Sequence, residues 1–330
     1  MRLFSLQLRG WVPPANAFYQ FFADSPNAFW LDREFNQSTP ISVIGAGLPT
    51  GEPPSKNFPS DAHEDLDLPF DWRPGLVGFF EYEGAPRFLD VDRAMVFDHE
   101  NRKIYLVGIF ETSDDFEHWC NAAFLRFGLI GGELAAYRLK ASRLQADAKT
   151  SVHVRHTADE YLQMISEAQK HIASGDVFQI CLTNRISIEH AVDPLAIFLN
   201  LRESNPAPYS SYVRIGQVTL VCSSPEQFLQ VNPSGLVSTK PIKGTRPRSD
   251  DANEDELLAE ELRTNEKERA ENLMIVDLMR NDIGRVTLAD SVRVSKLFET
   301  LLNEESCPLK LGFIDIVDIF VLTSLKFEKF

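Results

Sequence analysis

Residues 240–248 read KPIKGTRPR and residues 265–286 read NEKERAENLMIVDLMRNDIGRV, and these two segments carry the most informative side chains of this 330-residue chain. Together they place one lysine between apolar neighbours, two glutamates at helical spacing and several arginines in a short region. These residue types are the ones that bind a small dianion beside a metal ion.

The second segment predicts a helix over Asp255–Met279 on which carboxylates continue an apolar stripe. Glu268, Glu271, Ile275 and Leu278 follow one another at intervals of three, four and three residues, so they share one face. Carboxylates that face a core are costly unless they meet a cation, and Mg²⁺ takes one or two carboxylates together with substrate oxygens. The pattern leaves two interpretations open: a magnesium site, or a helix face solvated by its basic neighbours.

Lys243 lies just beyond a predicted strand, between Ile242 and Gly244. A lysine held against apolar neighbours could have a depressed pKa and act as nucleophile or base, although a surface lysine in a loop gives the same pattern. Gly244 with Thr245 would let backbone N–H groups approach a ligand.

Further candidates flank these residues. Glu226, at a strand break, could be a half-buried acid with a raised pKa that protonates a leaving group, or an ordinary turn glutamate. The acidic run Asp250–Glu261 is expected to be a solvated face and helix start. Four arginines could clamp carboxylates, although each alone could equally be a surface residue: Arg246, Arg248, Arg280 and Arg285.

The composition, with 44% hydrophobic and 25% charged residues, is typical of a soluble globular protein. A net charge of −15 argues against nucleic acid or an anionic membrane as the main partner, because the long-range field repels polyanions. The sequence predicts neither a signal peptide nor a membrane span. Four cysteines without paired spacing argue against a zinc site or a disulfide framework, so we expect a cytoplasmic protein.

The pattern along the chain predicts an α+β fold. Tight turns between short strands favour antiparallel sheets, packed as a layered sandwich with helices outside. A polar segment at residues 140–156 predicts a domain boundary, which gives an N-terminal domain 1–148, a second domain 149–298 and a tail 299–330. Thr157 is a predicted N-cap and Gly175 a predicted helix stop. Strands are predicted at residues 41–47, 75–80, 103–108, 178–182, 211–214, 218–222, 227–231 and 236–239, and helices at 114–127 and 158–174.

Three segments, SSPEQFLQV at 223–231, KPIKGTRPR at 240–248 and ERAENLMIVDLMRNDIGRV at 268–286, resemble in order and spacing the chorismate-utilising enzymes. These are anthranilate synthase component I, aminodeoxychorismate synthase component I and their isochorismate relatives. The resemblance covers about residues 159–298 and implies the layered antiparallel fold of anthranilate synthase component I. AFWLD at 28–32 and GLVGFFEYEGAPRF at 75–88 resemble the N-terminal domain of the family more loosely.

In this family a lysine in the PIKGT motif marks the aminodeoxychorismate enzymes. The resemblance therefore implies that chorismate and glutamine-derived ammonia give 4-amino-4-deoxychorismate, the precursor of p-aminobenzoate in folate synthesis. Lys243 would attack the ring at C2, Glu226 would protonate the departing hydroxyl, and Glu268 with Glu271 would hold Mg²⁺. A glutamine amidotransferase subunit, component II, would deliver the ammonia. Gln179 replaces the lysine base of the water-adding relatives, and an amide cannot deprotonate water. The residues expected to contact the substrate are Gln179, Gly244, Thr245, Arg280 and Arg285.

The sequence departs from the family after Phe298. The family would continue with a His-Leu-Val-Ser-type segment and, later, a second pair of metal-binding glutamates, whereas residues 299–330 read ETLLNEESCPLKLGFIDIVDIFVLTSLKFEKF. A frameshift or a premature stop would produce such a tail, so we expect an incomplete C-terminal lobe with unpaired sheet edges, poor stability and little activity. The alternative functions are anthranilate synthase component I and a non-catalytic remnant that acts as a binding module.

Overall fold

The computed structural model describes residues 1–36, 38–51, 67–81, 84–132, 134, 135, 137, 151–189, 193–232, 235–288, 291–302 and 311–320. These residues divide into two compact units, Met1–Leu134 with Ile197–Phe330, and Ala135–Ala196. The boundary predicted near residue 148 lies outside the described residues. None of the helices in the described part is both long and apolar enough to cross a membrane.

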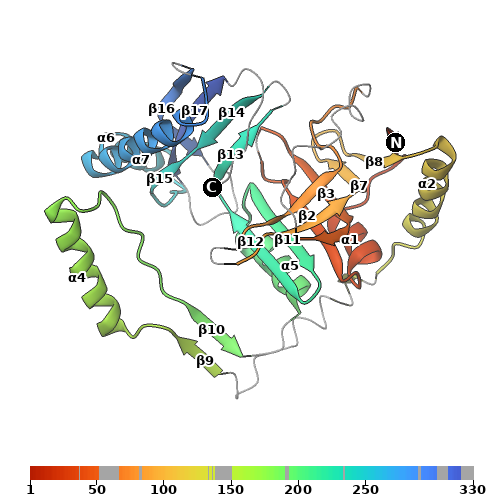
Figure 1. Ribbon diagram of the computed structural model, residues 1–330, viewed down its shortest axis with the longest axis horizontal. Coiled ribbons are helices and arrows are strands. Elements are labelled where there is room, and N and C mark those ends of the chain that lie inside the picture. Colours follow the sequence, from red (N-terminus) through yellow and green to blue (C-terminus); the bar gives the residue numbers. More distant parts are fainter. Residues whose placement is uncertain are drawn as a thin grey trace. The chain divides into compact units, whose positions relative to one another are not determined.

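The larger unit contains an antiparallel sheet of seven described strands in the order β1, β8, β7, β3, β2, β11, β12. Their bounds are β1 Arg2–Gln7, β2 Asn27–Asp32, β3 Ile41–Ala46, β7 Arg93–Asp98, β8 Lys103–Phe110, β11 Tyr209–Ile215 and β12 Val218–Ser224. β2 and β11 lie side by side although they are far apart in the sequence (Figure 1). The sheet thus joins strands from both sides of the predicted domain boundary.

A smaller described sheet covers part of the large one. It consists of β4 (Leu48–Thr50), β6 (Arg87–Val91) and β5 (Gly75–Phe79). Apolar side chains of both sheets share one buried core, for example Leu89 of β6 with Phe29 of β2, each 0% exposed. Two helices pack on the large sheet, α1 (Pro14–Phe22) on β3 and α2 (Ser113–Phe127) on β8. The predicted layered sandwich with outer helices is confirmed.

A buried polar network ties β2, β3 and α5 (Pro194–Ser204) together. Asp32 is 1% exposed, accepts a hydrogen bond from Ser42 Oγ at 2.9 Å and forms an ion pair with Arg202 of α5. Ser42 Oγ also lies 2.7 Å from Nε2 of His99. Burial lowers the pKa of His99, and the nearby charges of Asp32 and Asp98 oppose that shift only in part. The imidazole is therefore neutral in the folded protein at neutral pH.

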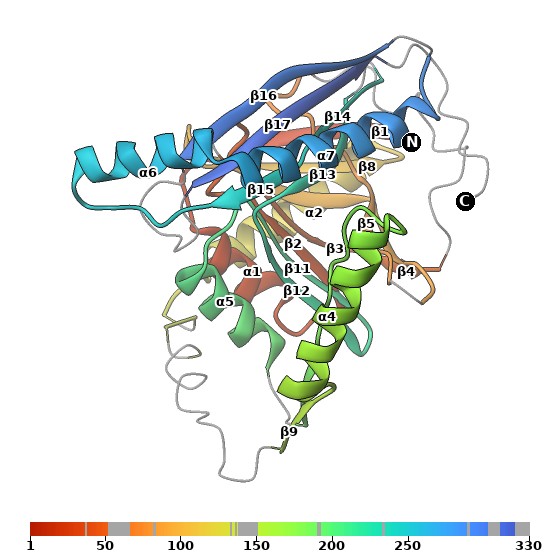
Figure 2. The same ribbon diagram turned by 90° about the vertical axis from the view of Figure 1, so that its left-hand side faces the viewer.

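A third described sheet in this unit carries the predicted site. Its strands are β13 (Gln227–Val231), β14 (Leu236–Lys240), β15 (Ile242–Thr245), β16 (Val292–Leu302) and β17 (Leu311–Phe320). The two helices that follow β15 are α6 (Ala252–Thr264) and α7 (Glu266–Gly284). α7 crosses β15, β16 and β17, and contacts all three (Figure 2).

The segment after Phe298, which was expected to be a tail, joins this sheet, while β13 and β16 each pair on one side only among the described strands. β16 continues through Leu302, and β17 pairs with β14, β15 and β16. Residues 311–320 read LGFIDIVDIF, which is rich in the β-branched and aromatic residue types that favour strands. The segment predicted to be a tail thus supplies a strand that gives the backbone of β14 and β15 its partners.

The single helix predicted over Asp255–Met279 is wrong, because the structure ends α6 and begins α7 around Asn265. The backbone of Asn265 is extended (φ −62°, ψ 115°), and its side chain accepts a hydrogen bond from the N–H of Glu268 at 3.1 Å. An asparagine that caps a new helix in this way stabilises the break, because it satisfies an N–H group that has no partner within the helix.

The smaller unit contains β9 (Ser151–Val154), α4 (Ala158–Ser174) and β10 (Ile186–Glu189). The predicted caps of α4 are confirmed: Thr157 and Glu160 form a capping box, and Gly175 adopts φ 78° at the carboxyl end. The strand predicted at residues 178–182 is wrong, since that segment has no regular structure and Phe178 is 88% exposed. Alternation of apolar residues does not form a strand unless the segment has a sheet to join.

Candidate active site

Lys243 lies within a strand, not beyond one as the sequence suggested. It is the second residue of β15 and pairs with Phe313 of β17. Its side chain is half-buried. Pro241 separates β14 from β15, which begins at Ile242. The register of β15 against β17 shifts between Lys243 and Thr245. This irregularity lets the strand change direction close to the amine.

Gly244 brings β15 against the first turns of α7. Its φ is +71°, in the left-handed region that favours glycine. A Cβ atom added there would lie 2.9 Å from Oε2 of Glu268 and 2.9 Å from Cδ1 of Leu262. The strand and the helix can therefore approach this closely only because residue 244 has no side chain. The predicted nucleophile and the first predicted metal ligand belong to one strand–helix contact.

The arginines that follow Lys243 bind protein carboxylates. Nη1 of Arg246 lies 3.4 Å from Oε1 of Glu268, and the same guanidinium pairs with Glu261. Arg248 binds both carboxylate oxygens of Asp255 through Nε, at 2.8 and 2.9 Å. The hydrogen bond from Arg246, with a second from Asn265, lowers the pKa of Glu261 to about 2. These ion pairs fasten the KGTRPR segment to α6 and α7.

The buried face of α7 differs from the predicted stripe. Asn272, Val276 and Ile283 are the buried residues, whereas Glu271 is half-buried and Leu278 is 52% exposed. The segment LMIVDLM is apolar on most sides of the helix, so the spacing alone did not fix which side meets the sheet. Glu271 therefore borders the buried face and does not point into the core.

Glu268 and Glu271 offer the oxygen donors that Mg²⁺ prefers. Glu268 is 13% exposed, and its carboxylate already has Arg246 as a cationic neighbour. Within the described part of the chain no three His, Cys, Asp or Glu side chains are gathered as a metal cluster would require. An ion held here would take these two carboxylates and complete its shell with water and substrate oxygens, which is a shell that Mg²⁺ accepts. The donor set therefore fits the expected ion.

Glu226 lies at the break between β12 and β13, as predicted, but it is exposed and not half-buried. The next residue, Gln227, pairs with Lys240 across the two antiparallel strands. Lys243 follows Lys240 by three residues, about 10 Å of extended chain. Glu226 is thus at the end of β13 that is nearest to Lys243.

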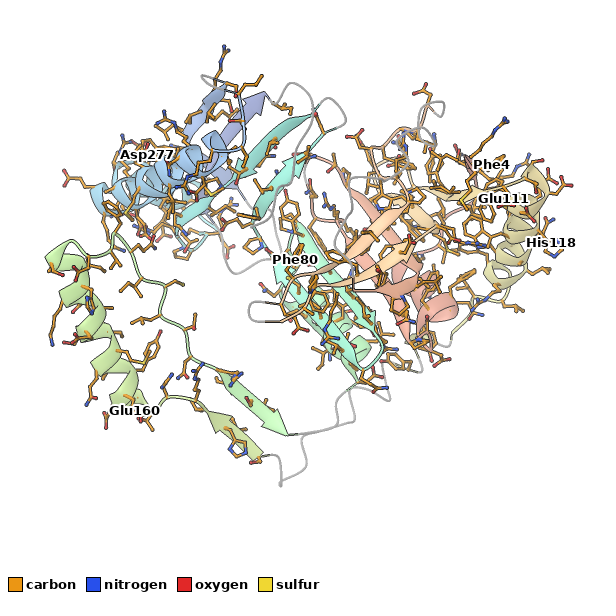
Figure 3. All side chains as sticks on the ribbon, viewed as in Figure 1. Phe4, Phe80, Glu111, His118, Glu160 and Asp277 are labelled. Atoms are coloured by element: carbon orange, nitrogen blue, oxygen red, sulfur yellow. The ribbon has the colours of Figure 1, made fainter. Side chains whose placement is uncertain are left out.

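Two of the predicted substrate contacts, Arg280 and Arg285, do not meet this group of residues. Arg280 is exposed and pairs with Asp277, which marks the outer side of α7 in Figure 3. Arg285 is exposed at the carboxyl end of α7. At about 1.5 Å per helical residue, Arg280 and Arg285 lie about 18 and 25 Å along the axis from Glu268. Gln179 lies in the smaller unit, in a segment without regular structure, where it is exposed.

Sequence reasoning missed two features of this region. Asp255 and Glu261 belong to the acidic run that was expected to be solvated, yet they anchor Arg248 and Arg246. Asn272 is 0% exposed, and neither amide atom has a hydrogen-bond partner among the described residues. No sequence signal distinguishes such an asparagine from one on a solvated helix face.

Residues 73–304 match the family described as chorismate binding enzyme. Because this match spans most of the chain and agrees with the layered fold, the protein belongs to the chorismate-binding enzyme family.

Two of the individual relatives differ in their named activity. The chain is 31% identical over 343 residues to an aminodeoxychorismate synthase of Streptomyces pristinaespiralis, a match that covers 87% of this chain and 47% of that protein. It is 37% identical over 325 residues to anthranilate synthase component 1 of Thermus thermophilus, covering 85% of this chain and 68% of the relative. The chain thus spans about half the length, or less, of the curated aminodeoxychorismate synthases that it matches, 47% of one and 34% of another.

The fold is similar to that of a solved relative. The crystal structure of anthranilate synthase component I from Streptococcus pneumoniae superimposes with a TM-score of 0.64 at 23% identity, over 98% of this chain and 70% of that one. The predicted α+β fold of the anthranilate synthase component I type is confirmed.

Proposed function

We propose that this protein is the component I of an aminodeoxychorismate synthase, which converts chorismate and ammonia to 4-amino-4-deoxychorismate. The observation that carries the proposal is the position of Lys243 on β15, one residue from the glycine that packs against Glu268. An amine nucleophile and a carboxylate pair, Glu268 with Glu271, thus lie on adjoining elements. The match to the chorismate-binding family supplies the substrate class.

In the proposed reaction the neutral amine Nζ of Lys243 bonds to ring carbon C2. Both ring double bonds shift, from C1=C2 and C5=C6 to C1=C6 and C4=C5, and the hydroxyl at C4 leaves with a proton from Glu226 as water. Ammonia then adds at C4, both double bonds return to their first positions, and the bond between C2 and Lys243 Nζ breaks. The net change replaces one hydroxyl by one amino group. When bound at Glu268 and Glu271, Mg²⁺ would supply positive charge for a substrate carboxylate.

The same proposal implies a partner and a place in the cell. Ammonia would be delivered by a glutamine amidotransferase subunit, and the product would serve p-aminobenzoate and folate synthesis. We expect this reaction in the cytoplasm, in keeping with the acidic chain and its cysteine usage.

A second candidate is anthranilate synthase component I, which the 37% identity to the Thermus thermophilus enzyme favours. The two functions differ at residue 243, where the anthranilate-forming members usually have alanine. An alanine cannot form the proposed bond at C2, so the lysine in this chain favours the amination product.

The test is to incubate the purified protein with chorismate, Mg²⁺ and ammonium and to identify the product by liquid chromatography with mass spectrometry. Because the sequence predicts little activity for this chain, the assay uses high protein concentration and long incubation. We expect 4-amino-4-deoxychorismate as the product, at least about 100-fold less of it with Lys243→Ala, and a chorismate adduct on Lys243 in the intact mass spectrum. Lys240→Ala is the matched control, since it removes another lysine from the same motif, and it should retain most of the activity. Fluorescent anthranilate as the main product, or equal losses in the two variants, would overturn the assignment.

A further inference from the structure

A cavity of about 580 Å³ lies between α1, α2 and the ends of β3 and β7, and it shares no residue with the candidate active site. It is large enough for a small organic ligand, and such sites are mostly apolar with a few placed polar groups. Its apolar walls include Phe21, Phe22, Leu48, Met95, Trp119 and Ala123. Glu111 and His118, labelled in Figure 3, line a hollow that adjoins it along α2.

One cation in this cavity is already neutralised. Arg93 is bound by its neighbour Asp92, with Nε and Nη2 each donating to a carboxylate oxygen at 3.0 and 2.7 Å. Its guanidinium also lies 4.5 Å from the ring centroid of Phe110. Arg93 therefore forms part of the wall and has little capacity left for a ligand anion.

Arg126, in the last turn of α2, lines the same cavity but has different bonding partners from Arg93. Its Nη2 donates to the backbone carbonyl of Gln20 at 2.6 Å, and its guanidinium lies 4.5 Å from the ring centroid of Phe21. No carboxylate pairs with Arg126 within the part of the chain that the structure describes. The guanidinium is thus held in place by neutral groups, which leaves its charge and its remaining N–H donors for an external anion.

We propose that this cavity binds a small monocarboxylic acid with an aromatic or branched apolar body. The carboxylate would contact Arg126, and the apolar body would lie against Trp119 and Phe22. Asp90 lines the same cavity and is exposed, so it repels a second negative charge on the ligand. The site therefore selects against dicarboxylates such as chorismate, and it is independent of the function proposed for Lys243.

The test is isothermal titration calorimetry of the unmodified protein with five probes: phenylacetate, indole-3-acetate, the amide of each acid, and phthalate as a dicarboxylate control. We expect saturable binding of the two monoacids, at least about tenfold tighter than that of their amides, because a charge-assisted contact to an arginine is lost in the amide. Phthalate should bind more weakly than either monoacid. Equal affinity for acids and amides, or no binding of either monoacid at millimolar concentration, would overturn the proposal.

The chain offers a matched control for the arginine. Arg214 also donates to two backbone carbonyls, those of Ala23 and Ser25, and lies 5.4 Å from an aromatic ring centroid, but it does not line the cavity. Arg126→Gln should weaken monoacid binding at least about tenfold, whereas Arg214→Gln should leave it unchanged. Equal effects of the two substitutions would mean that Arg126 acts only through the fold.

A second variant keeps the proposal falsifiable if Arg126→Gln does not fold. Ala122 is exposed on α2 and lines the cavity, and leucine is a good helix former, so Ala122→Leu should fill the space without disturbing the helix. It should abolish the binding of phenylacetate and of indole-3-acetate. Binding as tight as in the unmodified protein would place the acids elsewhere and overturn the proposal.

Discussion

Gly244→Ala tests whether the contact between β15 and α7 depends on the missing side chain. An alanine at φ +71° costs about 1 to 2 kcal/mol, because the left-handed conformation brings Cβ close to the following carbonyl oxygen. The added Cβ would also lie 2.9 Å from Glu268 Oε2 and from Leu262 Cδ1. The carboxylate can swing away, but Leu262 is 0% exposed and has no space to yield. Overpacking of this kind costs about 1 to 3 kcal/mol, which gives about 2 to 5 kcal/mol in total.

Gly216→Ala separates the two contributions. Gly216 has φ +60° in the turn between β11 and β12, and nothing lies within 4 Å of the Cβ that an alanine would add. This control carries the backbone cost and the same change in the unfolded chain, but no crowding. Urea denaturation should therefore give a loss about 1 to 3 kcal/mol larger for Gly244→Ala than for Gly216→Ala. Equal losses would refute the inference that a Cβ atom at residue 244 would lie within 2.9 Å of Glu268 and Leu262.

Three further predictions concern charges. Arg202→Met should destabilise the protein by about 3 to 5 kcal/mol in urea denaturation, because it leaves the buried carboxylate of Asp32 without its cation. Adding Asp32→Asn to this variant should recover part of the lost stability. No recovery would contradict the pairing of Arg202 with Asp32. The pKa of Glu261, followed by carbon-13 NMR, should be about 2 and should rise toward its ordinary value in Arg246→Gln; an unchanged value in the variant would show that Arg246 is not the cause. Burial lowers the pKa of His99, so the unfolded chain binds a proton at this imidazole more tightly than the folded protein does. The contribution of His99 to the free energy of unfolding is therefore complete above its ordinary pKa of about 6.5. That contribution is lost as the pH falls from there through the lowered pKa of the folded protein. His99→Gln should remove that part of the pH dependence in denaturation curves, and an identical dependence in the variant would contradict it.

The parts of the fold that the sequence predicted correctly are those with a local physical cause. The caps of α4 were predictable because Thr157 and Gly175 act on the nearest turn of their own helix. The split at Asn265 was missed because apolar spacing continues across it, while the cap depends on one side chain that turns back to an N–H group. The strand predicted around Phe178 failed because a strand needs a neighbour that local pattern does not reveal.

The site divides in the same way. The motif identified Lys243 and Glu268, and the structure brings their elements together through Gly244. It did not indicate that Arg246 and Glu261 would bind each other, because their pairing depends on how α6 returns to β15. Glu268 and Arg285 lie at opposite ends of α7, so the length of the helix separates them. The sequence pattern had instead suggested that both side chains belong to one substrate site.

The position of β2 in the large sheet constrains the order in which the chain can fold. Trp30 of β2 pairs with Tyr212 of β11, so one edge of β2 stays open until a segment roughly 180 residues further along has been made. At about 5 to 20 residues per second of synthesis, that interval lasts about 10 to 40 s. During this time the N-terminal strands can pair with one another but present an open apolar edge, which other chains can join. A ribosome-bound nascent chain that ends before Tyr209 should therefore depend more on chaperones than one that extends beyond Ser224.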